Sequence, residues 1–424
     1  MEDTARRKRR DLIQNIAIVV LSLSAVLLFA QTQIYNLISD PGSLTDRLSG
    51  APAADAAVQQ APLTAPVRVA VTGVYDRYGA YLTTDAEAFS DLGLLLKESL
   101  GAAGTLTPSR AEEFLSALSG TSVYYDFLSP LPLSILSELV GGEEDGTVCV
   151  RQLVLSAVSG SVRLYTWDGA DMFLSCPVPP ISANDLTEIA NSCSFGVAAF
   201  AFDEKELEPD YGRIAPCSLL LSEAPALPVL SAANPLSSTD ELLVSLGFNP
   251  STKNRYTDAG GTEIIGETNR SLQIGSGGDV LYQSGGDPAV EIDAAEDMPT
   301  LREAADGAAA LLRELLGDLS GEASLYLTSA SQSGETSTLR FGYHVGGVPV
   351  YFSDGADAAE VVLTGTTVTQ LSLRFRQYTA SGGTSLLLPL RQTLAIAAAD
   401  HPGAELSIGY ADSGAEVSAQ WLAE

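Results

Sequence analysis

The sequence is poor in the residues that carry most enzyme and metal chemistry. Its 424 residues include only two histidines, His344 and His401. Neither lies in an H-E-x-x-H metal motif, and no G-x-S-x-G or S-x-x-K nucleophile motif is present. We interpret both histidines as surface or turn residues. The sequence therefore predicts no enzyme, no catalytic or metal site and no cofactor.

Cysteine is scarce as well, and its spacing excludes a zinc cluster. The four cysteines, none of them in a C-x-x-C pair, are Cys149, Cys176, Cys193 and Cys217. An even number outside the cytoplasm is compatible with two disulfides, in three possible connectivities. Four free thiols are the alternative, and the sequence leaves both open.

Basic residues are few, with 23 lysines and arginines against 53 acidic residues, for a net charge of −30. Five of the basic residues form the run Arg6–Arg10, so the rest of the chain is still more acidic. Nucleic acid as a partner is excluded, because its binding requires many basic side chains to neutralise phosphates. Carboxylates are so abundant that pairs of them predict no glycosidase site. The acidic turn Asp354–Asp357 lacks the spacing of a calcium loop.

One long apolar run is present, directly after the basic run. No charged residue occurs from Leu12 to Ser39, and Ile16 to Ala30 is nearly all apolar. Together with Leu12 and Ile13, this apolar stretch approaches the roughly 20 residues of a spanning helix. The basic side of such a helix stays in the cytoplasm. We therefore predict a cytoplasmic basic tail and transmembrane anchor over residues 1–38, with the bulk of the chain outside the cell membrane. A cleaved signal peptide is the competing interpretation.

The rest of the chain divides by composition. Residues 39–66 are rich in alanine and proline and predict a spacer. A proline-rich run near residue 230 predicts a boundary. The predicted domains are an N-terminal α+β domain over 67–230, a helix followed by a strand meander over 231–320, and a C-terminal α+β domain over 321–424.

Alternating strands interrupted by a few amphipathic helices predict the α+β class, with antiparallel meander sheets and helices packed on one face. The clearest helix follows Thr300, where apolar residues recur every three to four positions. A helix capped by Thr107, another with a capping box at Ser238 and Glu241, and one starting near Pro389 are also expected.

The stretch Gly260–Asn269, GGTEIIGETN, differs at one position from the phosphate loop G-x-x-x-x-G-K-[ST]. Glu267 stands where that loop needs a lysine, and a carboxylate would repel phosphate. The following residues alternate and are separated by glycines, as in strands joined by a turn. The sequence therefore predicts a hairpin without nucleotide chemistry.

Three stretches carry a family resemblance. They are Asn254–Ser284, Phe341–Phe352 with the pattern of strand, glycine and P-V, and the ending that combines Leu388–His401, Leu406–Asp412 and Trp421. Together they resemble the YycH/YycI family, which are membrane-anchored regulators of the WalK (YycG) sensor histidine kinase in Gram-positive bacteria. The resemblance covers roughly residues 240–421, and the length is closer to YycH. It implies a non-catalytic regulator in cell-wall signalling, with the kinase and a YycI-like protein as partners.

Two other functions stay open on sequence grounds. One is an exported module that binds a ligand or a wall polymer, and the other is a cell-wall hydrolase of an uncharted kind. A sensor kinase and a response regulator encoded beside this chain would favour the regulator.

The predicted contact with a kinase lies in the membrane helix. Only about eleven residues precede the apolar run, so they cannot form a cytoplasmic domain. Asn15 and Ser22 are seven positions apart and share a helix face, with Ser24 and Ala25 as small neighbours. Polar and small residues of this kind join helices within a membrane.

Overall fold

The computed structural model describes residues 65–73, 78–81, 87–136, 148–193, 198–204, 212–221, 225–286 and 289–423. Among these residues, no helix is both long and apolar enough to cross a membrane. The predicted anchor over 1–38, with Asn15, Ser22, Ser24 and Ala25, lies outside them. Residues 61–424 form one compact unit. The predicted boundary at residue 320 stays a prediction.

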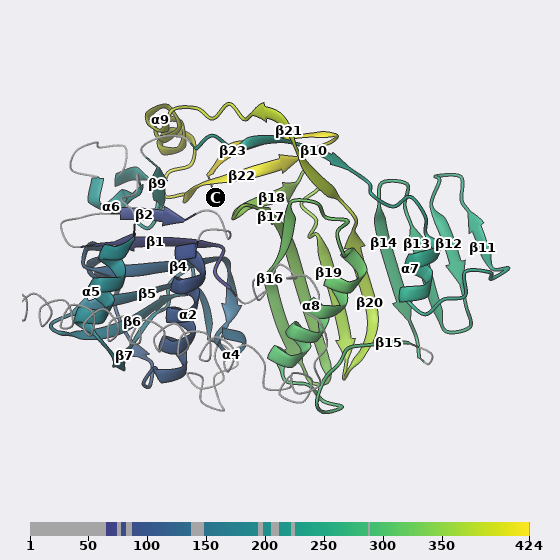
Figure 1. Cartoon of the computed structure of the whole chain (residues 1–424), viewed down its shortest axis with the longest axis horizontal. Helices are drawn as coiled ribbons and strands as arrows, with labels where there is room; N and C mark the ends of the chain where they lie inside the picture. Colours follow the sequence, from purple (N-terminus) through teal and green to yellow (C-terminus); the bar gives the residue numbers. More distant parts are fainter. Residues whose placement is uncertain are drawn as a thin grey trace, which may run out of the picture. The chain divides into compact units, whose positions relative to one another are not determined.

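The first sheet has seven strands in the order β2-β1-β4-β5-β6-β7-β3, all paired antiparallel (Figure 1). Its strands are β1 (Arg68–Thr72), β2 (Tyr78–Tyr81), β3 (Thr107–Pro108), β4 (Ser122–Pro132), β5 (Cys149–Val158), β6 (Ser161–Trp167) and β7 (Phe173–Ser182). The helices of this region are α2 (Glu87–Ala102), α3 (Ala111–Ser119), α4 (Leu133–Leu136) and α5 (Ala183–Ser192).

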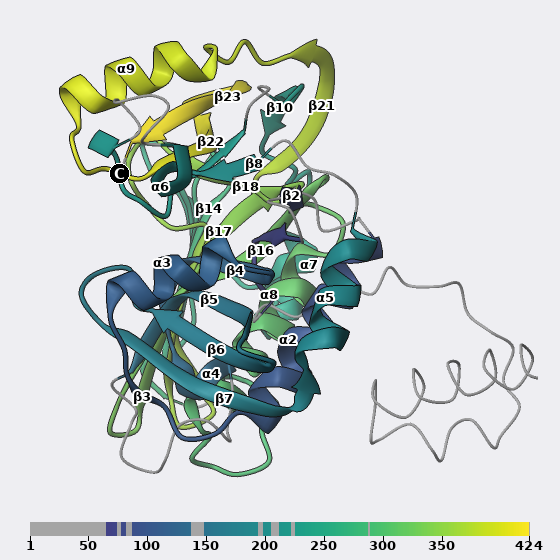
Figure 2. The same ribbon diagram turned by 90° about the vertical axis from the view of Figure 1, so that its left-hand side faces the viewer.

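Helices cover both faces of this sheet, which corrects the prediction of a single covered face. The Tyr125 hydroxyl on β4 donates to the Leu92 carbonyl of α2, whereas the Ser156 hydroxyl on β5 donates to the Ala117 carbonyl of α3. Because Tyr125 pairs with Leu153, three positions from Ser156, these two side chains point to opposite faces. Figure 2 shows α2 and α5 on one side of the strands and α3 on the other.

The helix predicted to start at Thr107 starts later, at Ala111. Thr107 and Pro108 form β3 instead, which pairs with β7, and the Thr107 hydroxyl donates to the Ser175 carbonyl at 3.0 Å. Pairing with a distant strand therefore overrides the local capping signal.

The second sheet has 14 strands, which run from β11 at one end to β21 at the other. Among its described strand pairs only β18 and β22 are parallel. Its strands are β10 (Pro228–Ala233), β11 (Arg255–Thr257), β12 (Glu263–Gly266), β13 (Arg270–Ile274), β14 (Asp279–Ser284), β15 (Val290–Glu291), β16 (Ala323–Ser333), β17 (Thr336–Val345), β18 (Val348–Phe352), β19 (Ala359–Thr364), β20 (Thr367–Arg374), β21 (Gln377–Thr384), β22 (Leu406–Asp412) and β23 (Glu416–Ala423).

The proline-rich run at residue 230 contains a strand of this sheet. β10 pairs with β21 on one side and β23 on the other, and Leu230 is fully buried. Both partners come from the last part of the chain.

Three helices accompany the second sheet, and a small sheet lies beside it. The helices are α7 (Asp240–Ser245), α8 (Leu301–Leu316) and α9 (Leu390–Asp400); the small sheet is β8 (Ala198–Phe200) with β9 (Leu219–Leu221), next to α6 (Ala201–Glu204). The helix predicted after Thr300 is confirmed as α8, and the structure adds a capping box formed by Thr300 and Glu303. The capping box predicted at Ser238 is not formed, because α7 is preceded by Thr239, whose hydroxyl bonds to Glu263. The start of α9 after Pro389 is confirmed.

Gly307 allows α8 to approach its neighbours. A Cβ atom at this position would lie 2.8 Å from Ile292 Cδ1 and 3.0 Å from Ile292 Cβ. Gly307→Ala is therefore expected to lower the free energy of unfolding by about 1–3 kcal/mol, although alanine favours helices. The matched control is Gly93→Ala in α2, where a Cβ meets nothing within 4 Å. It should raise stability by about 0.5–1 kcal/mol. Urea unfolding of both variants checks this, and stabilisation by both would contradict the close approach.

Candidate functional site

Two arginine-centred clusters bring together charged side chains from several strands. The first, which we call the Arg68 cluster, consists of Arg68 on β1, Asp126 on β4, Arg151 on β5 and Glu405, which precedes β22. Asp126 is fully buried, and Arg68 and Glu405 are nearly so. Two positive and two negative groups make the cluster neutral.

Distances within the Arg68 cluster show that Glu405 joins it from outside the first sheet. Arg68 Nη2 lies 3.0 Å from Asp126 Oδ2 and 3.5 Å from Glu405 Oε1, and Arg151 Nη2 lies 2.7 Å from Glu405 Oε2. Burial alone would lower the pKa of Arg68, but Asp126 and Glu405 reverse this, so its pKa is raised and it stays charged. The cluster therefore fastens the start of β22 to the first sheet.

Asp126 also accepts hydrogen bonds from the backbone of β4 and from a tyrosine. The Leu128 amide donates to Asp126 Oδ1 at 2.8 Å, and the Tyr124 hydroxyl donates to Oδ2 at 3.1 Å. Leu128 has φ +65°, in the left-handed region. This conformation is uncommon for a leucine, and it accompanies an irregularity in the pairing of β4 with β5.

All four cysteines are free thiols, the second of the two alternatives, and none of the three disulfide connectivities is formed. Cys217 is buried, and burial together with Glu405 and Asp126 raises the pKa of its thiol to about 12. Burial likewise raises the pKa of Cys176 to about 11. Because the thiolate is the nucleophilic form, these two thiols are unreactive at neutral pH.

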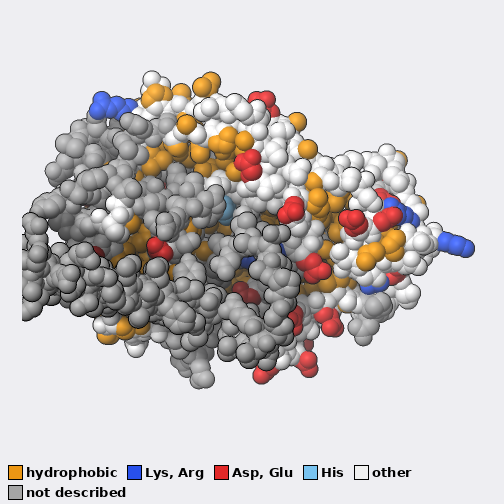
Figure 3. All heavy atoms as spheres, in the orientation of Figure 1, with side chains coloured by type: hydrophobic (Ala, Val, Ile, Leu, Met, Phe, Trp, Pro, Cys, Tyr) orange, Lys and Arg blue, Asp and Glu red, His pale blue; other side chains and the backbone are white. Residues whose placement is uncertain are grey.

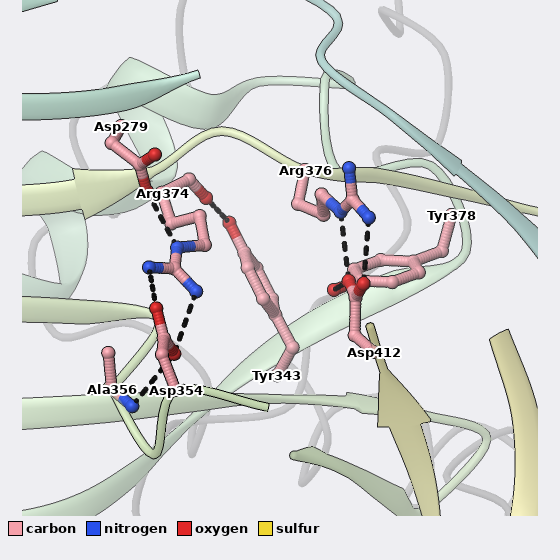
Figure 4. Close-up of polar contacts among 8 residues, drawn as sticks. All are labelled: Asp279, Tyr343, Asp354, Ala356, Arg374, Arg376, Tyr378 and Asp412. Carbon is pink, nitrogen blue, oxygen red and sulfur yellow. Dashed lines mark hydrogen bonds and ion pairs between the residues drawn. The ribbon is translucent and has the colours of Figure 1, made fainter. Parts of the chain in front are cut away.

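The second cluster, which we call the RFRQY cluster, surrounds residues 374–378 between β20 and β21 (Figure 4). Arg374 Nε donates to Asp279 Oδ1 at 2.7 Å, and its two terminal nitrogens donate to Asp354 at 2.8 and 3.2 Å. The guanidinium also lies 4.4 Å from the ring centre of Phe352, a cation–π distance. Arg374 thus ties the β11–β14 meander to the turn after β18.

Arg376 faces a more deeply buried carboxylate. Its Nε and Nη2 atoms donate to Asp412 at 2.8 and 2.7 Å, and the Tyr378 hydroxyl donates to the same carboxylate at 2.7 Å. Asp412 is 5% exposed, so this is a buried bidentate pair at the end of β22. Burial, reinforced by the bond to Asp412, raises the pKa of Tyr378, which stays a donor. The alternation R-F-R-Q-Y explains the arrangement, since Phe375 between the arginines is fully buried.

Acid should weaken the exposed part of this cluster. Hydrogen bonds from Arg374 and the Ala356 amide lower the pKa of Asp354 to about 2, from about 3.9 in an unfolded chain. A depressed folded pKa means that the stabilisation is complete above about pH 4 and is lost as the pH falls towards 2. The stability difference between wild type and Asp354→Asn should therefore shrink over this range. Urea midpoints at several pH values measure it, and a constant difference would show that the pair contributes no pH-dependent stability.

The phosphate-loop-like stretch is a hairpin, as predicted. β11 pairs with β12, and Asp258 Oδ1 accepts from the Gly260 and Thr262 amides in the turn. Glu267 bonds to Arg270, which also donates to the Gly247 carbonyl after α7 and stacks 4.6 Å from the Phe248 ring centre. Glu267, which stands in the lysine position of the phosphate loop, therefore holds Arg270 where it packs α7 on the β11–β14 meander.

Both histidines lie at the ends of secondary-structure elements, His344 near the end of β17 and His401 directly after α9. His344 was expected at the surface or in a turn; it is buried, so the surface alternative is wrong, and its Nδ1 accepts from the Gly347 amide at 3.2 Å in the turn between β17 and β18. His401 is exposed at the end of α9, as expected. The described residues hold no group of three or more metal-ligating side chains.

Sequence reasoning did not single out either cluster. The alternation of Arg374, Arg376 and Tyr378 was the available signal for the RFRQY cluster. A small, mainly apolar pocket beside Arg68 was not foreseen either; it is lined by Arg68, Leu219, Leu221, Gly347, Val348, Ser407, Ile408 and Trp421.

Both clusters pair opposite charges and connect segments that are distant in sequence, which suits a role in joining the sheets, although Arg68 Nε is buried without a hydrogen-bond partner among the described residues. Comparison with protein-family models, with curated proteins and with solved structures finds no match for this chain.

Proposed function

We propose that the chain is a membrane-anchored, extracytoplasmic regulator of a two-component sensor histidine kinase, which acts by protein contact and not by catalysis. The observation that carries the non-catalytic part is the internal pairing of the buried charges. Asp126 and Asp412 each accept hydrogen bonds from a tyrosine and lie against arginines, so neither is poised as a general base. The buried thiol of Cys217 is protonated.

The placement and the partner of this regulator come from the sequence. The basic run before the uncharged segment Leu12–Ser39 supports a cytoplasmic N-terminus and a single crossing of the cell membrane. The resemblance to the YycH/YycI family supports a sensor kinase and a YycI-like protein as partners, in cell-wall signalling. The acidic surface supports the absence of a nucleic-acid partner.

Contact with the kinase is tested in the membrane helix. Asn15→Leu with Ser22→Leu removes two polar groups, and each hydrogen bond between membrane helices contributes roughly 0.5–2 kcal/mol. We therefore expect weaker association with the kinase helix, by about tenfold, while export and ectodomain folding stay unchanged. A two-hybrid assay in membranes, or crosslinking, measures the association.

The matched control is Val20→Leu with Leu27→Val, which changes the other side of the same helix without altering polarity. This control should associate as wild type does. If the Asn15 and Ser22 variant also associates normally and kinase output is unchanged, the contact must be sought in the ectodomain. If no kinase associates with the wild-type chain, the proposed function is wrong.

A further inference from the structure

Backbone strain and an unsatisfied polar side chain occur together near the end of β4, around Asp126. In the described part of the chain, two residues other than glycine have a positive φ, Leu128 and Ser159. Ser159 lies in the exposed turn between β5 and β6, where such a conformation is usual. Leu128 instead follows the buried Phe127 within β4 and has φ +65°. This conformation is unfavourable for a bulky side chain, so other contacts must hold Leu128 in it.

One carboxylate oxygen of Asp126 holds Leu128 in this conformation. Asp126 Oδ1 accepts a hydrogen bond from the Leu128 amide at 2.8 Å, and Arg151 Nε lies 3.6 Å from the same oxygen. On the face drawn in Figure 3, acidic side chains are scattered over the surface, where water solvates them. Asp126 is fully buried, so protein groups must satisfy its oxygens. The two nitrogens occupy both lone pairs of Oδ1 and leave none for a third donor.

A third donor lies directly opposite, in the side chain of Gln152 on β5. Gln152 pairs with Asp126 across the two strands. The side chains of such a pair project from the same face, with Cβ atoms about 4.5–5.5 Å apart. Gln152 is fully buried, and neither its Nε2 nor its Oε1 atom has a hydrogen-bond partner among the described residues. A buried amide without partners is costly and uncommon in folded proteins. Asp126 is the kind of acceptor that this amide lacks.

We propose that the turn at Leu128 has two states, in which the Leu128 amide and the Gln152 side chain alternate as donors to Asp126 Oδ1. In the state seen here, the Leu128 amide donates to that oxygen. In the second state Leu128 takes an ordinary negative φ, its amide donates to water, and Gln152 Nε2 donates to Oδ1. Water reaches the turn, because Leu128 and Ser129 are half-buried and Pro130 is exposed.

The two states exchange one hydrogen bond to Asp126 for another, which keeps them close in free energy. The pairing of β4 with β5 is already interrupted after Asp126, so the turn changes without breaking the ladder. The second state relieves the strain of Leu128 and satisfies Gln152, at the cost of the ordered turn. Arg68 connects Asp126 to Glu405 before β22, so the choice of state is linked to the second sheet. Such a two-state element is what a protein contact can bias, and its existence does not depend on the anchor or the kinase.

Hydrogen exchange of the full chain in detergent, followed by mass spectrometry, tests the two states. Leu128→Gly removes the strain of the left-handed conformation and so favours the state seen here. Gln152→Met keeps the side-chain volume but removes the donor of the second state. Each substitution should slow exchange of the amides in residues 127–131 about tenfold, after correction for intrinsic rates. The matched control is Ser159→Gly, which changes the other left-handed residue and should leave exchange in 127–131 as in wild type.

Leu128→Pro isolates the second state, because proline has no amide hydrogen and cannot adopt a positive φ. In this background Gln152→Met should lower the folding equilibrium constant at least about tenfold in urea unfolding, since it removes the donor that replaces the Leu128 amide. In the wild-type background the same substitution should leave this constant unchanged or raise it. The same loss in both backgrounds, or wild-type exchange rates in Leu128→Gly or Gln152→Met, would overturn the proposal and leave the kinase proposal standing. If Leu128→Pro does not fold, the exchange rates of the other two variants decide.

Discussion

Asp126→Ala is expected to lower the free energy of unfolding by about 3–5 kcal/mol. The substitution leaves Arg68 and Arg151 facing each other in a buried site with Glu405 as the one remaining carboxylate of the cluster. An uncompensated buried charge costs much more than an exposed pair contributes. Urea unfolding of the full chain in detergent measures the loss, provided that the slope with urea stays constant.

Two comparison variants make the result specific. Asp354→Ala removes an ion pair whose carboxylate is 54% exposed and should cost only about 0–1 kcal/mol. Arg68→Met combined with Asp126→Leu removes one charge of each sign and leaves Arg151 paired with Glu405. Its loss should be much smaller than that of Asp126→Ala alone. Equal losses from Asp126→Ala and Asp354→Ala would show that the Arg68 cluster does not fasten β22 to the first sheet.

Asp412→Ala should have an effect of similar size, about 3–5 kcal/mol. It leaves the Arg376 guanidinium, with only 17% of its side chain exposed, without its bidentate partner. It also leaves the buried Tyr378 hydroxyl without its acceptor. Hydrogen exchange followed by mass spectrometry should show faster exchange in β21 and β22, the strands that this cluster joins.

Tyr378→Phe separates the contribution of the tyrosine hydroxyl from that of the Arg376–Asp412 pair. It removes only the hydroxyl, whose bond to a charged group is worth about 1.5–3 kcal/mol, and keeps the arginine pair. A smaller loss than that of Asp412→Ala is the expected order. If Tyr378→Phe costs as much as Asp412→Ala, the arginine pair adds nothing and the account of this cluster is wrong.

The sequence was sufficient for the elements whose causes are local. α8 has both a 3.6-residue apolar period and a capping box, and the hairpin of β11 and β12 has an Asp258–Gly261 turn. Each of these signals lies within about 16 residues of chain. Elements that depend on distant partners were harder to predict from the sequence. Thr107 looked like a helix cap but pairs with β7, and the proline-rich run at residue 230 is a strand that residues 377–384 and 416–423 enclose.

The clusters were beyond sequence reasoning for a related reason. Arg68 and Glu405 are more than 300 residues apart in the chain, yet their side chains lie 3.5 Å apart. With 53 acidic residues available, nothing in the sequence indicates which carboxylate meets which arginine. The burial of His344 was not predicted, because the sequence does not show that a turn amide three residues away satisfies its ring nitrogen.

The strand order of the second sheet also determines how long β10 stays unpaired while the chain is synthesised. β10 ends at Ala233, and its two partners end about 150 and 190 residues later, at Thr384 and Ala423. At a synthesis rate of about 5–20 residues per second, the first partner is complete only about 8–30 s after β10. Leu230 is fully buried in the finished sheet but has no strand beside it during that interval. Residues 228–233 are therefore open during this interval to any factor that holds unfolded chains.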